Sequence, residues 1–278
     1  MEPITSSVSS LAPIPVRATV GAALQFIRAE WKPLLRIALV PGSIVGALQM
    51  LLMLLTPEHP SPPGTFDVNA LVLILELLLL FIVQSFVVSW QVVSTMRFVG
   101  LGEQSQQWFP AFPPTLWSYM WRMFLLSLIS CVCIIPIALA GGIVYAGFHS
   151  RTILILLLIC AVPFWLAVLI RLGLTPVAAA VGEDKHFMMA WRRTKGQTLR
   201  ICGVKFLAAL AGMLVVLASG LLTLFIGLLS KTLAAIIGGT VTNITMVTLW
   251  SVISILLLRY FYQQTPDKLQ ETDGDHVL

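Results

Sequence analysis

Six long apolar segments run through this chain, and each exceeds the roughly 20 residues that an α-helix needs to cross a bilayer. A backbone that lies in hydrocarbon must satisfy its own hydrogen bonds, which restricts it to helices or a closed barrel. The segments are continuously apolar and lack the alternation of barrel strands. We therefore predict an all-α, polytopic membrane protein with six transmembrane helices arranged as three hairpins.

The composition agrees with lipid as the main solvent. Hydrophobic residues make up 58% of the chain and charged residues only 10%, against roughly 25% in soluble domains. A formal net charge of +5 could indicate nucleic acid as a partner. The basic residues flank apolar stretches, however, so we expect anionic lipid headgroups as their counterpart and no nucleic acid.

The polar breaks divide the chain into three parts. A polar N-terminal segment (1–17) precedes the transmembrane domain (18–263), and an acidic tail (264–278) follows it. Two short amphipathic stretches, 18–31 and 186–195, are expected to lie in the headgroup plane. Gly238-Gly239 is a competing break within the last span. The expected spans are 33–56, 68–99, 116–147, 152–181, 197–229, and a sixth from the turn at 230–232 to about 263.

All but two of the 17 Lys and Arg residues fall on one side of these spans, which we call the basic side. The two exceptions are Arg151 and Lys231. Cytoplasmic loops carry the excess of Lys and Arg, so the pattern predicts cytoplasmic N- and C-termini. We expect no cleaved signal peptide, because the N-terminus lacks a basic start followed by a short apolar core.

Two segments on the basic side resemble a pattern found in certain bacterial inner-membrane proteins, and the resemblance implies a location in a bacterial inner membrane. RLGLTP at 171–176 is followed by AWRRTKG at 190–196, which leads into a helix. This is similar to the six-helix membrane domain fused to some glycerophosphodiester phosphodiesterases and to its uncharacterised stand-alone relatives. Trp191, Thr194, Lys195 and Gly196 match, whereas Ala190 replaces a Ser and Arg193 a Leu. Because the catalytic domain has no counterpart here, the resemblance implies a membrane module without activity.

Glu76 is the sharpest single feature of the apolar segments. It lies within VLILELLLL, where an ionised carboxylate is costly unless it is paired, protonated or beside water. Gln84 lies on the same span and Asn243 on the last one, so the three could line a polar intramembrane site. The alternatives are a carboxylate near the outer interface and ordinary hydrogen bonds between helices.

A cluster of cations marks the basic side near the resemblance motif. Guanidinium groups bind phosphate bidentately, so the cluster could contact lipid headgroups. The alternative is an ordinary orientation signal whose aliphatic stems cover apolar surface. The candidate headgroup residues are Arg36, Arg171, Arg192, Arg193, Lys195 and Arg200.

Gly42 and Gly46 form a G-x-x-x-G motif that permits close helix approach, either within one chain or between two copies. We expect contact within the chain. No catalytic motif, cofactor fingerprint or metal-ligand spacing occurs in the sequence. The sequence thus predicts a non-enzymatic membrane protein that acts through lipid, a membrane-protein partner or a second copy. The rival hypothesis is a small-solute or ion transporter with its polar site near Glu76.

Overall fold

A computed structural model describes residues 14–55, 68–103, 111–148, 151–183, 187–228 and 230–263, and all regular secondary structure in these ranges is helical. Six helices are long and apolar enough to cross a membrane, which confirms an all-α, polytopic membrane protein. The predicted tail and the first residues of the N-terminal segment lie outside the described ranges. The helices are α1 (Val16–Ala29), α2 (Trp31–Leu55), α3 (Val68–Leu101), α4 (Leu116–Phe148), α5 (Arg151–Leu172), α6 (Leu174–Ala180), α7 (Phe187–Arg193), α8 (Thr198–Gly227) and α9 (Lys231–Gln263).

The fourth span is broken, whereas the sequence pattern predicts one helix over 152–181. The break falls at Gly173, between α5 and α6. Pro176 explains it, because a proline has no N–H to offer the carbonyl group four residues earlier, that of Leu172. The chain continues into α6, all of whose residues are buried.

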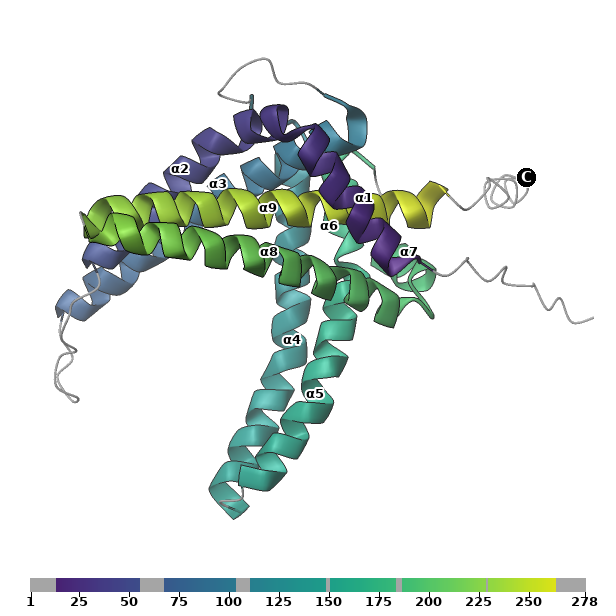
Figure 1. Cartoon of the computed structure of the whole chain (residues 1–278). Coiled ribbons are helices and arrows are strands. Elements are labelled where there is room, and N and C mark those ends of the chain that lie inside the picture. Colours follow the sequence, from purple (N-terminus) through teal and green to yellow (C-terminus); the bar gives the residue numbers. More distant parts are fainter. Residues whose placement is uncertain are drawn as a thin grey trace, which may run out of the picture.

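The long helices form a bundle from which one hairpin departs. α8 and α9 lie alongside each other, α2 packs closely against α9, and α3 contacts both α2 and α9. Figure 1 shows the α4–α5 hairpin pointing away from this bundle. The three predicted hairpins are present, since α2 packs on α3, α4 on α5 and α8 on α9. The pairing of α2 with α9 joins the first hairpin to the last.

Glycines set the distance between α2 and α9. A Cβ atom built on Gly42 would lie 2.6 Å from Cγ1 of Ile244, and one on Gly46 would lie 2.7 Å from the carbonyl oxygen of Ile236. These distances are shorter than real Cβ contacts, so the two helices can approach this closely only because residues 42 and 46 have no side chain. The predicted role of the G-x-x-x-G motif inside one chain is confirmed.

Gly238 and Gly239 do not interrupt the last span, since α9 is continuous through both residues. A Cβ atom on Gly238 would lie 2.8 Å from Cγ2 of Thr223 on α8. One on Gly239 would collide with Gln49 on α2. The two glycines therefore let α9 fit between its neighbours, and the competing break predicted there is absent.

The amphipathic stretch at 18–31 forms most of α1, which crosses α8 and α9 on their basic side (Figure 1). Val20 and Ala23 are buried against the bundle, and Val16 approaches Gly203 of α8. Arg17 and Arg28 on the other side of the helix are exposed. The amphipathic pattern thus positions α1 across the bundle, with its apolar residues packed against α8 and α9.

Candidate functional site

A cavity of about 670 Å³ lies where the α4–α5 hairpin leaves the bundle. Its walls come from α4, α5, α6, α8 and α9, together with one residue of α3. Most of the lining is aliphatic or aromatic. Lys205 of α8 is the charged residue in the lining.

Lys205 is held beside an aromatic ring. Its Nζ atom lies 4.7 Å from the centroid of the Trp250 ring on α9, which is within the range of a cation–π interaction. Gly173, at the break between α5 and α6, lies beside the ammonium group: a Cβ atom built there would lie 3.7 Å from Nζ, an ordinary van der Waals distance. The unusual helix break and the lysine therefore belong to the same corner of the cavity.

Three hydroxyl-bearing residues also line the cavity, all from α4: Tyr119, Ser127 and Ser130. The Ser130 hydroxyl accepts a hydrogen bond of 2.8 Å from Nε1 of Trp165 on α5, which ties the two helices of the hairpin together. A cation and hydroxyl groups within apolar walls match a ligand that has an anionic head and an apolar body. Among the described residues that line the cavity, none is a carboxylate or histidine that could act as a general base.

Arg171 joins the two segments of the resemblance motif. Its guanidinium carbon lies 3.6 Å from the centroid of the Trp191 ring. The same group donates hydrogen bonds to the carbonyl oxygen of Trp191 and, over 3.2 Å, to the hydroxyl of Thr194. These contacts hold the two segments together, and they use two nitrogen atoms of a predicted headgroup residue.

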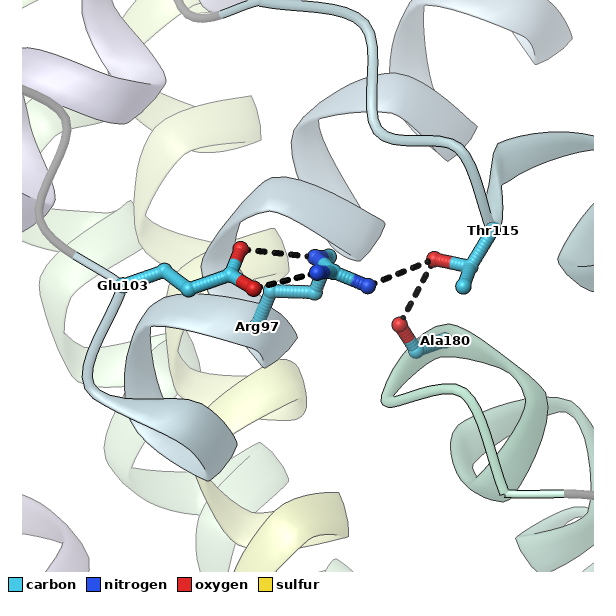
Figure 2. A network of polar contacts seen from close by, with 4 residues as sticks. All are labelled: Arg97, Glu103, Thr115 and Ala180. Atoms are coloured by element: carbon cyan, nitrogen blue, oxygen red, sulfur yellow. Dashed lines mark hydrogen bonds and ion pairs between the residues drawn. The ribbon is translucent and has the colours of Figure 1, made fainter.

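A second arginine network links three helix ends, as Figure 2 shows. Arg97 near the end of α3 forms a bidentate ion pair with Glu103, and its Nε–Oε2 distance is 2.8 Å. Arg97 also donates to the Thr115 hydroxyl, which donates in turn to the carbonyl oxygen of Ala180 at the end of α6 over 2.8 Å. The start of α4 is thereby fixed between α3 and α6.

Further arginines close this network around the basic side. Arg259 of α9 donates a hydrogen bond of 2.7 Å to the carbonyl oxygen of Gly100 on α3. Arg193 of α7 donates over 3.4 Å to that of Phe261 on α9. Cations near the C-terminal carbonyl groups of helices interact favourably with the helix dipole. Part of the charge asymmetry therefore stabilises the fold.

The remaining predicted headgroup residues divide into two groups. Arg192, Lys195 and Arg200 are exposed near the junction of α7 and α8 and remain candidates for headgroup contact. Arg36 is half-buried within the bundle.

Arg36 lies at the level of a buried polar layer. Gly42 of α2 faces Ile244 of α9, and Gly100 of α3 faces Ile255 of α9. Counted along the three helices from these contacts, Arg36, Thr95 and Ser251 lie at about the same depth. Thr95 and Ser251 are fully buried, and within the described ranges their hydroxyl groups have no hydrogen-bond partner.

Glu76, Gln84 and Asn243 lie in different surroundings. Glu76 is exposed on α3 next to the exposed Leu75, Gln84 is half-buried, and Asn243 is 7% exposed on α9. The contacts in the described ranges do not join the three side chains. Whether they act in one polar site stays a prediction.

Lys205 was not predicted as a site residue from the sequence, where it contributed only to the charge asymmetry between the two sides. Its signal was present: the residue lies inside the apolar run ICGVKFLAAL, seven positions after the start of α8. The partner ring of Trp250 is distant in sequence and could be found only in the folded chain.

The chain matches no protein-family model, no curated relative and no solved structure.

Proposed function

We propose that this multi-pass membrane protein resides in a bacterial inner membrane with both termini in the cytosol and acts by contacting anionic phospholipid. It is proposed to be non-enzymatic, because its sequence contains no catalytic motif and its resemblance to the phosphodiesterases is confined to their membrane domain. A membrane-protein partner or a second copy of the chain could pack against its exposed apolar helices. The basic side would then face the anionic cytoplasmic leaflet.

The observation that carries this proposal is the surface at the junction of α7 and α8. Leu199 is 87% exposed and Met188 is 63% exposed, which is costly in water. Arg200 follows Leu199 directly, and Arg192 lies four residues after Met188 on the same helix face. Apolar side chains next to exposed cations match the boundary between acyl chains and headgroups.

Lipid that co-purifies with the protein tests this function. We expect the protein extracted from membranes to retain more phosphatidylglycerol, relative to phosphatidylethanolamine, than the bulk membrane contains. The variant R192A/K195A/R200A should lose most of this enrichment, because each surface cation contributes about 1 kcal/mol near an anionic leaflet. Lys231→Ala on the opposite side is the control. Retained lipid with the bulk composition in the wild-type protein would refute the proposal.

Transport of a small solute or ion through a polar intramembrane site near Glu76 is the second candidate. The observation in its favour is Asn243, whose amide nitrogen and oxygen are buried without a hydrogen-bond partner in the described ranges. Gln91 on α3 is in the same condition. A buried amide of this kind costs free energy unless it serves a ligand or water. Asn243→Leu should abolish uptake into proteoliposomes under this hypothesis, and unchanged uptake would exclude it.

A further inference from the structure

We propose that the cavity beside Lys205 binds one anionic phospholipid. The phosphate group contacts the Lys205 ammonium group, and the acyl chains leave the cavity along α4, α5 and α8. This inference rests on the lipid function proposed above and adds to it a single defined site with a named cation. It differs from the surface at the α7–α8 junction, which would contact headgroups from outside the bundle.

The charge of Lys205 is the first argument for this site. Lys205 lies about 10 Å along α8 from Thr198, and apolar residues flank it in the sequence. A cation within a membrane span is costly unless it is paired or reaches water. Among the described residues, Lys205 has the Trp250 ring as its partner and forms no ion pair. Because one ring face serves only one side of an ammonium group, donors remain for an anion.

The shape of the cavity is the second argument. A volume of about 670 Å³ lies within the range of roughly 300–1,000 Å³ that is usual for ligand sites. The cavity is lined by residues of both the α4–α5 hairpin and the bundle. These two parts diverge (Figure 1), so a ligand can extend beyond the cavity. Phe206 is 62% exposed and Leu166 is 41% exposed, and both line the cavity. They provide an apolar exit for acyl chains into the surrounding lipid.

The hydroxyl groups are the third argument, because they favour phosphate. Ser127 is exposed, Tyr119 is buried, and both line the cavity on α4, opposite the α8 wall. Phosphate oxygens accept several hydrogen bonds at once. Tyr119 and Ser127 lie about 12 Å apart along α4, so one of these two hydroxyl groups would share the phosphate group with Lys205. Electrostatic attraction to Lys205 then selects headgroups with a net negative charge over zwitterionic ones.

Native mass spectrometry of the purified full-length chain tests the site. The detergent-solubilised protein is titrated with phosphatidylglycerol, with phosphatidylcholine of the same acyl chains, and with oleate. We expect the first phosphatidylglycerol to bind more tightly than the first phosphatidylcholine. Lys205→Met should weaken that first binding step about tenfold, which corresponds to the loss of one hydrogen bond to a charged group. Phosphatidylcholine binding should be unchanged.

Matched variants separate a lost site from a damaged fold. Ala209→Phe fills the cavity while it keeps Lys205, and it should weaken the same binding step. Ala218→Phe is its control, since Ala218 is also exposed on α8 but is not among the residues that line the cavity. Lys32→Met is the control for charge, because Lys32 is an exposed lysine on α2, away from the cavity lining.

The outcomes distinguish this inference from the proposed function. Unchanged first binding in both Lys205→Met and Ala209→Phe, with reduced lipid retention in R192A/K195A/R200A, would refute the cavity site and leave the lipid function standing. Unchanged lipid binding in all three variants would refute both. Oleate that displaces phosphatidylglycerol from the first site at equal concentration would also overturn the inference, because the ligand would then be a fatty acid.

Discussion

The α2–α9 interface and the α4–α5 hairpin show two ways to build with apolar helices. In α9, 56% of the most apolar stretch is buried, and in α4 only 6%. The α2–α9 interface depends on Gly42 and Gly46, which let the backbones approach. Large side chains on α4 and α5, such as Ile143 and Phe164, are instead exposed. Apolar helices thus serve internal packing at the α2–α9 interface, whereas those of the hairpin leave large apolar side chains exposed.

The two regions also differ in how they use proline. Pro136 of α4 and Pro163 of α5 lie equally far from the turn that joins these helices. Each proline removes one backbone hydrogen bond, so both helices are weakened at the same level of the hairpin. In α2, Pro41 is buried next to Gly42 in the close interface with α9. The surrounding bundle supports α2 at its proline, and the hairpin lacks this support.

The comparison predicts its largest effect at glycine. Gly46→Leu should lower the free energy of unfolding by roughly 3 kcal/mol, because the new side chain would overlap the α9 backbone. Gly142→Leu in the hairpin should have almost no effect, since no atom lies within 4 Å of its Cβ position. Unfolding by SDS in mixed micelles measures both variants. Equal losses of stability would contradict the distinction between the two regions.

The Arg171 clamp should give the second-largest effect. Arg171→Lys keeps the charge but loses the planar group that stacks on Trp191 and donates to two oxygen atoms. We expect a loss of about 2 kcal/mol in the same unfolding assay. Arg192→Lys is the matched control on α7, because Arg192 is exposed. A loss in the control as large as in Arg171→Lys would show that the clamp does not stabilise the fold.

The Arg97–Glu103 pair should contribute less. Glu103 is half exposed, so water and salt screen its interaction with Arg97. Glu103→Gln should therefore reduce stability by less than about 1 kcal/mol, and the difference should shrink in high salt. Thermal unfolding at two ionic strengths measures it. An effect that does not depend on salt would mean that Glu103 acts through something other than its charge.

The smallest effect is expected within the hairpin itself. Trp165→Phe removes the hydrogen bond to Ser130 and should cost about 0.6 kcal/mol, the average for such bonds between membrane helices. The combination with Ser130→Ala in a double-mutant cycle isolates the pair. A coupling energy several times larger would show that the hairpin is held more rigidly than its exposed surface indicates.

Sequence reasoning predicted most helix bounds to within about two residues, because hydropathy and loop composition determine where a chain can cross a bilayer. The expected span 116–147 corresponds to α4 (Leu116–Phe148). The sequence pattern did not predict the break at Gly173, because the hydrogen bond that Pro176 cannot form involves the carbonyl group of Leu172, four residues earlier. The G-x-x-x-G contact was predicted as internal, yet the partner helix could not be derived from a local pattern.

The candidate site was less accessible to sequence reasoning. Lys205, Trp250 and Ser127 come from three different helices, and only the packing of these helices brings the three residues to one cavity. The charge pattern did predict that arginines gather on the basic side. It could not show that Arg97, Arg171 and Arg259 bind carbonyl or hydroxyl groups of neighbouring helices.

The orientation of the basic side is the claim on which the proposed lipid contacts depend, and cysteine labelling tests it most directly. Single cysteines replace Lys195 or Thr232 in a variant without the four native cysteines. Each variant is expressed in bacteria, which are then converted to spheroplasts. A membrane-impermeant maleimide should label Thr232→Cys in intact spheroplasts and Lys195→Cys only after the membrane is permeabilised. Labelling of Lys195→Cys in intact spheroplasts would place the basic side outside the cell and contradict the account.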